Sequence, residues 1–553
     1  MKRSKGLSAG STVHGKALPG NGEKETHAAV SFVDVTRLSI LILIGLYVLY
    51  RIFTLDLMSD EWGGLKNIYI KSIADLISFK YVDAQSHFLQ SLLSISCWRG
   101  FPEAYEGITI RLPSLIGLCA FLYAAFRITA LGESGFLKTL GLLALCTNAF
   151  LLDYFGLARG YGMALGFLLL GLWHLVRACD TPALGMHFHL ALWCGCLALL
   201  CNLAWLCYYL AICFLLCCHV YLSQSPGGLA GRIRGTLSSG QPIFYNMLFV
   251  GTFYLPRVIL LNERQGLYFG GNEGFVKDTV QSLVKGVLYV PETIKGVQYE
   301  WLSYGIFTLC GLASCISIYR LWKDRPLTPI VKASGLIAIV LVLSALCVEM
   351  MNLLFNVKYV IERAATGFLM IALCQLVLFT ASVTKWWRHA LASLLIVFSV
   401  AGALNLNLSH NYLRVTSQMS EFVRWIGETR AKDGRHLIIG TDSWANYTIW
   451  YYIETLLGLK ESEQTKSGIG FVRIYNGVTL YSIELPDNKD LFDENTDYLL
   501  LRHRKKYGQY PKPLRLVKQF RHAGLDLFAC EGAKTLPEST FKGVVYPARF
   551  SGE

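Results

Sequence analysis

The sequence predicts an α-helical protein that spans a membrane about eleven times and carries a small α/β domain after the last span. Of its 553 residues, 53% are hydrophobic and only 16% are charged, whereas soluble domains carry about 25% charged residues. The apolar residues fall in blocks close to the roughly 20 residues that a helix needs to cross a bilayer. After residue 407 the composition changes, and short apolar runs alternate with helical patterns.

The first apolar block, at 37–55, follows a polar tail at 1–36 that is rich in Gly, Ser and Lys. We expect this tail to be disordered and cytoplasmic. Basic residues precede the block and no small-residue cleavage site follows it, which predicts an uncleaved first helix rather than a signal peptide. Ten further blocks lie at 111–131, 137–152, 159–178, 187–204, 206–222, 243–262, 300–320, 331–352, 364–383 and 390–406. The parity of this topology requires a break within 202–205, which is its least constrained point.

The net charge of +13 does not indicate nucleic-acid binding, because its distribution is that of a membrane protein. Lys and Arg gather in short clusters between apolar blocks, for example at 232–234, 320–325 and 385–388. Cytoplasmic loops carry such an excess of positive charge. With these clusters inside, the loops at 56–110 and 263–299 and the C-terminal region at 407–553 lie outside. The short loops and compact tail predict a bacterial inner membrane, with the C-terminal domain in the periplasm.

The C-terminal region has the pattern of a small α/β domain. An amphipathic helical pattern around 413–426 is followed by a short apolar strand at 436–440 and a second helix through 452–456. Further strand-like runs occur at 470–484, 498–502 and 524–529.

Two adjacent carboxylates, Asp60 and Glu61, follow the first span directly. Carboxylates at the mouth of a membrane helix are costly unless they face water or a partner. Two interpretations remain open: the pair caps and solvates the end of the helix, or it belongs to a functional site.

Other polar segments also fall at the predicted outer face. The loop contains a Tyr81–His87 segment with Asp83 and His87, and Arg111-Leu112-Pro113-Ser114 opens the second span. A second cluster holds Asp153, Arg159 and Tyr161, and a third, between two late spans, holds Lys358, Tyr359 and Arg363. Cations are disfavoured in short outer loops, and arginine binds phosphate bidentately. Phosphate binding, ion pairing and contact with lipid head groups all remain open for them.

The order of these motifs resembles the first outer loop of GT-C glycosyltransferases, in particular the protein O-mannosyltransferases and the lipid A aminoarabinose transferases. The resemblance covers about residues 37–405 and is strongest over 56–180. These families carry an acidic pair, then an Asp/His segment, and then Arg-x-Pro-Ser at the next helix. Phe88-Leu89 stands where Pro-Pro often follows the histidine, which leaves the role of His87 open.

The resemblance implies a membrane glycosyltransferase that moves a sugar from a polyprenyl-phosphate carrier to a lipid, glycan or protein acceptor, with inversion. Asp60 would be the base that takes the acceptor proton, and Glu61 would position the acceptor or tune the charge. The expected donor-side residues are Arg159, Tyr161, Lys358, Tyr359, Arg363, Asp83, His87 and Asp153. No metal-ligand spacing is visible, so we expect no cofactor and leave a divalent metal open.

Two other functions compete with this hypothesis. A transporter or flippase of lipid-linked sugars would place polar sites near the bilayer midplane and show internal repeats. Here the charged motifs gather at one face, and no matching halves are evident. A non-catalytic assembly subunit is the third interpretation. It would leave the clustered acids and arginines without a function.

Overall fold

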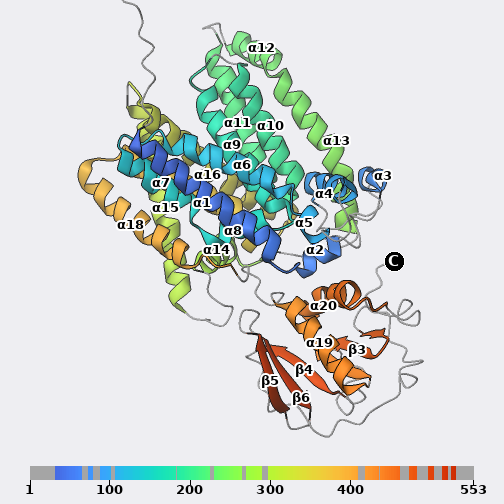
Figure 1. Ribbon diagram of the computed structural model, residues 1–553. Coiled ribbons are helices and arrows are strands. Elements are labelled where there is room, and N and C mark those ends of the chain that lie inside the picture. Colours follow the sequence, from blue (N-terminus) through green and yellow to red (C-terminus); the bar gives the residue numbers. More distant parts are fainter. Residues whose placement is uncertain are drawn as a thin grey trace, which may run out of the picture.

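The computed structural model describes residues 31–64, 72–78, 87–100, 106–181, 184–224, 229–263, 270–288, 297–324, 326–408, 418–434, 436–441, 443–460, 472–482, 496–502, 514–520 and 525–530. Most of the expected tail and Asp83 lie outside these residues. Over the described part, the chain forms a large helical bundle with a small sheet domain at one end (Figure 1). The predicted fold class is therefore confirmed.

Within the described residues, nine helices are long and apolar enough to cross a membrane. They include α1 (Phe32–Thr54), α9 (Gly160–Ala178), α11 (Leu206–Ser223), α13 (Gln241–Glu263), α15 (Val297–Lys323), α16 (Pro329–Phe355), α17 (Thr366–Ser382) and α18 (Lys385–Leu404), together with the segment ending in α6 (Ser114–Thr129). A bent pair, α7 (Gly135–Cys146) and α8 (Ala149–Asp153) with the short helix η3 (Tyr154–Gly156), makes a tenth if counted as one span. The difference from about eleven is α10 (Met186–Cys201), which has 16 residues.

The break that the topology required lies where it was expected. Helix α10 ends at Cys201, a single turn η4 (Leu203–Trp205) follows, and α11 then begins. Asn202 has an extended backbone, and its side-chain oxygen accepts a hydrogen bond from Ala204 N–H at 3.0 Å. A side-chain cap of this kind starts a new helix in an otherwise continuous apolar run.

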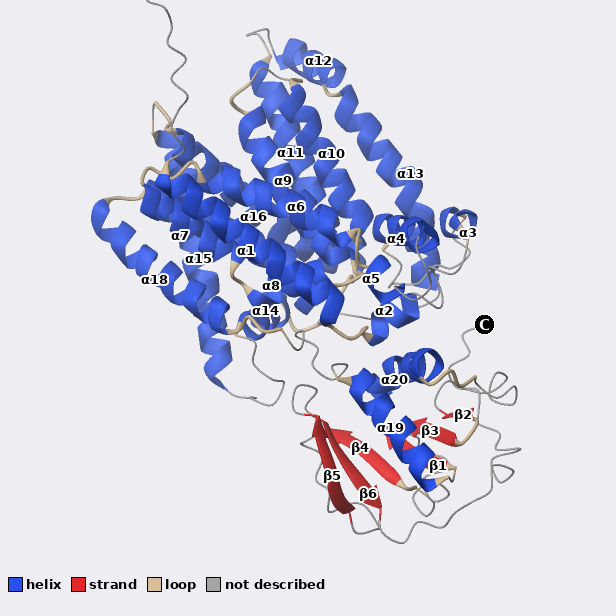
Figure 2. Cartoon of the chain, in the orientation of Figure 1, coloured by secondary structure: helices blue, strands red, loops and turns tan. Residues whose placement is uncertain are grey.

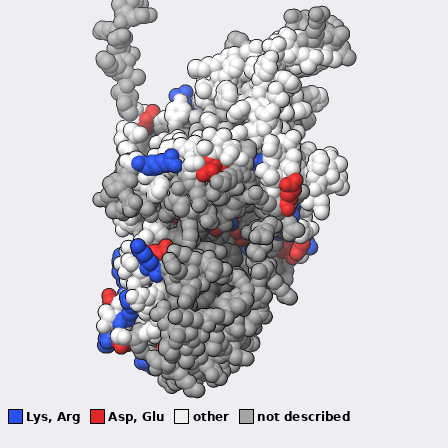
Figure 3. All heavy atoms as spheres, turned by 90° about the vertical axis from the view of Figure 1, so that its right-hand side faces the viewer, with Lys and Arg blue, Asp and Glu red and all other residues white. Residues whose placement is uncertain are grey.

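The outer surface of the bundle suits a hydrocarbon environment. Large apolar side chains are exposed on its peripheral helices, including Leu43, Phe53, Trp322 and Leu404. Figure 3 shows the upper part of one face with few charged residues, whereas Lys, Arg, Asp and Glu are visible nearer the C-terminal domain. This distribution is what lipid contact around a membrane-spanning bundle requires.

Helices α6 and α9 pack at very short range because glycines face one another at their crossing. A Cβ atom at Gly166 would overlap the carbonyl oxygen of Gly117, and a Cβ at Gly117 would overlap the backbone of Met163. Small residues allow backbones to approach closely in membrane bundles. This contact holds α9, whose N-terminus adjoins Arg159, against the helix that begins near Arg111.

The C-terminal domain has a six-stranded mixed sheet in the order β2-β3-β1-β4-β6-β5 (Figure 2). Strand β1 is parallel to β3 and β4, and the other neighbours are antiparallel. The strands are β1 (Leu437–Thr441), β2 (Val472–Tyr475), β3 (Val478–Ser482), β4 (Tyr498–Arg502), β5 (Leu514–Phe520) and β6 (Leu525–Cys530). Two helices, α19 (Met419–Asp433) and α20 (Ser443–Leu456), cover the sheet through Phe422, Ile426, Trp450 and Ile453. Strand β5 was not expected from the sequence.

We expect Gly166→Ala to lower the free energy of unfolding by about 1–3 kcal/mol, the usual cost of overpacking a core. The added methyl group would push α6 and α9 apart. Thermal unfolding of the purified protein in detergent measures the effect.

Gly45→Ala is the matched control, because a Cβ atom at Gly45 meets no atom within 4 Å. Alanine is the better helix former, so the control should be neutral or slightly stabilising. Equal melting temperatures for the two variants would contradict the close packing of α6 on α9.

Candidate active site

The two adjacent carboxylates lie in the first turn of α2 (Ser59–Gly64), a short helix that follows the C-terminal end of α1. Successive side chains on a helix point in different directions. Asp60 and Glu61 therefore contact different partners and serve different purposes, even though the sequence presents them as a pair.

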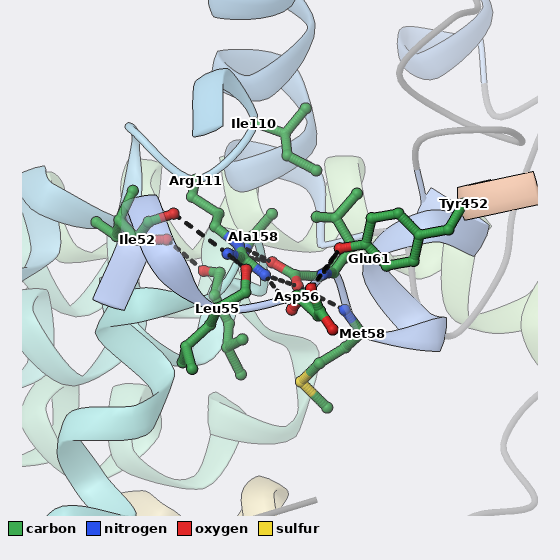
Figure 4. A network of polar contacts seen from close by, with 12 residues as sticks. Ile52, Leu55, Asp56, Met58, Glu61, Ile110, Arg111, Ala158 and Tyr452 are labelled. Atoms are coloured by element: carbon green, nitrogen blue, oxygen red, sulfur yellow. Dashed lines mark hydrogen bonds and ion pairs between the residues drawn. The ribbon is translucent and has the colours of Figure 1, made fainter. Parts of the chain in front are cut away.

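Glu61 is fully buried in an ion pair with Arg111 (Figure 4). Arg111 Nε donates to Glu61 Oε1 at 2.8 Å, and Arg111 Nη2 donates to Oε2 at 2.6 Å. The backbone N–H groups of Ala158 and Met58 donate to the same carboxylate at 2.6 and 3.0 Å. With both oxygens occupied and no exposed surface, Glu61 holds three segments of the chain together.

Arg111 also closes the end of α1. Its guanidinium donates to the carbonyl oxygens of Leu55 at 2.8 Å, Asp56 at 2.9 Å and Ile52 at 3.3 Å. The last carbonyls of a helix have no partner within that helix. Arg111 supplies one and thereby fixes the segment that leads from α1 to Asp60.

Asp60 lies among arginines instead. Arg363 Nη1 donates to Asp60 Oδ2 at 2.8 Å, and Arg159 Nη1 lies 3.1 Å from the same oxygen. Burial alone would raise the pKa of Asp60, but the charges of Arg159 and then Arg363 outweigh it, so the pKa lies below its ordinary value of 3.8. The side chain is 18% exposed. Asp60 is thus an ionised carboxylate that solvent or a substrate can reach.

The two arginines come from distant parts of the chain. Arg159 precedes α9, and a Cβ atom on the next residue, Gly160, would overlap the carbonyl oxygen of Cys201. Arg363 lies in η6 (Glu362–Ala365), immediately before α17. The Arg159 guanidinium lies 5.8 Å from the centre of the Tyr161 ring, which is compatible with a cation–π contact. The sequence named both arginines, and the structure brings them to one carboxylate.

His87 is buried beside this cluster, with its ring 5.0 Å from that of Tyr161 in an edge contact. Burial, and then the charges of Arg159, Arg257 and Arg363, hold the pKa of His87 well below 6.5, so it is neutral. Its Nε2 atom has no hydrogen-bond partner among the described residues. A buried polar atom of this kind is unusual and could accept or donate a hydrogen bond to a ligand.

Arg257 is a residue of this region that the sequence analysis missed. It is 5% exposed, follows Pro256 within α13, and acts electrostatically on His87. A cation inside an apolar helix is itself a functional signal in a membrane protein, and this signal could have identified Arg257.

The remaining expected residues lie in other contacts. Arg51 Nη2 donates to Asp153 at 2.6 Å, and this pair is buried. Tyr359 donates to Glu349 Oε2 at 3.0 Å, and its backbone pairs with Gly271. Lys358 is half-buried in the same segment. The structure therefore pairs Asp153 with Arg51 and Tyr359 with Glu349, rather than with Asp60.

A large apolar cavity of about 600 Å³ lies between α14 (Gln281–Val287), α15, α16, α17 and α18. Among the described residues that line it, Glu349 is the charged one. The lining follows α17 from Phe368 to Thr380, which is ~18 Å at 1.5 Å per helical residue. Phe368 comes little more than one helical turn after Arg363, so the cavity begins near the arginine cluster.

In the part of the chain that the structure describes, no three His, Cys, Asp or Glu side chains come close enough to hold a metal ion.

No model of a known protein family matches the chain, and no curated protein matches it either. Among solved structures, it is similar to the oligosaccharyltransferase AglB from Archaeoglobus fulgidus in complex with an inhibitory peptide and a dolichol-phosphate. The identity is 13% and the TM-score 0.40, over 76% of this chain and 64% of that one. It is also similar to ArnT from Cupriavidus metallidurans bound to undecaprenyl phosphate, with 11% identity and a TM-score of 0.38 over 91% of this chain and 99% of that one.

Both proteins belong to the GT-C superfamily, which is also the class that the sequence motifs resemble. At these identities and TM-scores, the likeness shows no function for this chain, and the evidence for one lies in the side chains of the site.

We expect Glu61→Gln to destabilise the protein by about 3–5 kcal/mol, because it leaves the buried Arg111 guanidinium without its counter-charge. The amide has nearly the same shape, so the loss would measure charge rather than packing. Thermal or denaturant unfolding in detergent provides the value.

Glu133→Gln is the control. Glu133 pairs with Arg388 at 3.0 Å, but its side chain is 58% exposed, and such surface pairs contribute at most about 1 kcal/mol. A Glu61→Gln protein as stable as the Glu133→Gln protein would contradict the structural role of Glu61.

Proposed function

We propose that this protein is a membrane glycosyltransferase that moves a sugar from a polyprenyl-phosphate carrier to an acceptor on the outer, periplasmic side of the membrane. One observation carries the proposal: an ionised, partly exposed carboxylate, Asp60, lies between Arg159 and Arg363 at the end of a bundle of membrane-spanning length. This arrangement provides an anion-binding site and a base next to each other.

The arginines serve the leaving group. A sugar attached to polyprenyl phosphate departs when the bond from its anomeric carbon to the phosphate oxygen breaks, and the phosphate keeps the electron pair. Preorganised cations stabilise the charge that develops on that oxygen. Arg159 and Arg363 bind the phosphate in this proposal, and Arg257 adds to the positive potential around His87.

Asp60 serves the acceptor. As the acceptor oxygen or nitrogen forms its bond to the anomeric carbon, its proton passes to the Asp60 carboxylate. Attack from the face opposite the phosphate inverts that centre. Without a donor, the Asp60 carboxylate pairs with both arginines. A bound phosphate competes with Asp60 for these contacts. Asp60 then loses cationic partners and becomes a stronger base when the donor is in place.

The other expected residues take secondary parts in the proposal. Tyr161 and the neutral His87 form the wall of the phosphate site, where His87 Nε2 has no partner among the described residues. Lys358 and Tyr359 keep a proposed donor-side role from the sequence motif, and Asp153 forms a buried ion pair with Arg51. Asp83 keeps a proposed role in donor binding from the sequence motif alone.

In this proposal, the apolar cavity binds the polyprenyl chain of the carrier. A polyprenyl chain needs a continuous apolar path that ends at its phosphate site, and the cavity begins near Arg363 and follows α17 for ~18 Å. Its lining of Leu, Val, Ile and Phe side chains supports a hydrocarbon occupant. The cavity along α17 is therefore the proposed path of the carrier chain.

We expect Asp60→Asn to lower the rate of sugar transfer by about 10²–10⁴-fold, because the amide cannot take the acceptor proton. Membranes containing the variant are supplied with a radiolabelled pool of polyprenyl-phosphate sugars, and labelled product is counted. Asp34→Asn is the matched control, since Asp34 lies in the first turn of α1, at the opposite end of that helix.

Undiminished transfer by a folded Asp60→Asn protein would remove Asp60 from the mechanism. Movement of lipid-linked sugar between leaflets without any transfer by the native chain would instead favour the transporter.

The kcat/KM of transfer reports the pKa values of the free enzyme, so it should not vary with the ionisation of Asp60 between about pH 5 and 8. The pKa of Asp60 lies below 3.8, so the carboxylate is the charged form throughout this range and is lost only as the pH falls through that lower value. The pKa of His87 lies well below 6.5, so His87 stays neutral near pH 7. Transfer to a hydroxyl acceptor measured against pH tests this. An acid limb centred near pH 6.5 would contradict the assignment of a neutral His87.

A further inference from the structure

The C-terminal domain contacts the segment that carries Asp60. Tyr452 on α20 donates its hydroxyl hydrogen to Asp56 Oδ1 at 3.0 Å, and the same hydroxyl oxygen accepts from Leu57 N–H at 3.0 Å (Figure 4). Burial, followed by the charge of Asp56, raises the pKa of Tyr452 well above 10. The hydroxyl is therefore a donor at neutral pH.

Asp56 has a second contact with the domain. Its other carboxylate oxygen, Oδ2, accepts from the backbone N–H of Ser420 at 3.2 Å. Ser420 lies in the first turn of α19, where backbone N–H groups have no partner within the helix. A carboxylate is favoured at this end of a helix. A residue at the end of the first membrane helix thus caps a helix of the C-terminal domain.

The neighbour of Tyr452 reinforces this junction by packing. Tyr451 packs against an apolar cluster that contains Leu57, Ile110 and Ala158. Ile110 precedes Arg111, and Ala158 donates its N–H to Glu61 and precedes Arg159. Two successive residues of α20 therefore contact the surroundings of the active site through a hydrogen bond and through packing.

The contacted segment depends on such partners for its position. Residues 55–58, between α1 and α2, have neither helical nor strand structure. Arg111 holds the carbonyl side of Asp56, and Tyr452 holds its side chain and the next N–H group. Asp60 follows Asp56 by four residues. A shift of 56–57 would be transmitted through this short segment to the carboxylate.

We propose that the C-terminal domain is a positioning part of the active site, in which Tyr452 acts through Asp56 to place the Asp60 carboxylate between its arginines. This inference rests on the proposed glycosyltransferase function. Tyr452 is a positioning residue and contacts none of the reacting groups.

Tyr452→Phe in the full-length protein tests the inference. The variant keeps the ring and loses both hydrogen bonds. We expect about a tenfold fall in kcat with an unchanged KM for the polyprenyl-phosphate sugar, within the ~100-fold that a 1 Å misplacement of a reacting group can cost. Tyr245→Phe is the control: it makes the same chemical change on an exposed residue of α13, and kcat should remain within about twofold of the native value, as for other surface substitutions.

Hydrogen exchange provides a readout that does not depend on catalysis. Leu57 N–H loses its acceptor in Tyr452→Phe, so exchange over residues 52–64 should be faster than in the native and Tyr245→Phe proteins. If the native chain transfers sugar and the Tyr452→Phe variant has an unchanged kcat or unchanged exchange, the positioning role alone would be overturned. A native chain that transfers no sugar, while exchange over 52–64 still responds to Tyr452→Phe, would overturn the proposed function and with it the catalytic meaning of the contact.

Discussion

The buried ion pair between Glu61 and Arg111 is the interaction on which the site depends. A charge at the edge of a membrane bundle is costly unless another charge and further hydrogen bonds satisfy it, and this pair meets both conditions. Through Arg111 it closes the end of α1, and through Glu61 it fixes the backbone at Ala158, next to Arg159. The position of the carboxylate in α2 and the position of one of its arginines are therefore set by the same contact.

This arrangement explains how two adjacent acids take different roles. Glu61 is satisfied completely and leaves no lone pair for a substrate, whereas Asp60 is partly exposed and contacts cations that a phosphate can also contact. In the resting site, the Asp60 carboxylate offsets part of the positive charge of the two arginines. In the proposed reaction, the donor takes over that task, and donor binding and base strength are coupled through shared arginines rather than through a movement of the fold.

The remaining architecture surrounds this centre with two different environments. On one side the apolar cavity follows α17 into the bundle, and on the other the C-terminal domain meets Asp56 through Tyr452 and Ser420. A hydrocarbon chain favours the first environment, and a polar acceptor favours the second. A site that joins both has to lie at the boundary between bundle and domain, which is where Asp60 meets Arg159 and Arg363.

The sequence by itself determined the elements of this protein. Block length and composition predicted the membrane helices and most strands of the C-terminal domain, because these follow from hydrophobicity. The distribution of positive charge between the loops required the break within 202–205. The sequence also named Asp60, Glu61, Arg159 and Arg363. The tertiary structure alone decided their partners: Glu61 with Arg111 across 50 residues, and Asp60 with Arg363 across 303. Sequence order does not encode which distant side chains meet, since that depends on how α6, α9 and α17 pack together. For the same reason, the sequence did not predict the place of Arg257 near His87 or the contact of Tyr452 with Asp56. Both depend on how distant segments pack together.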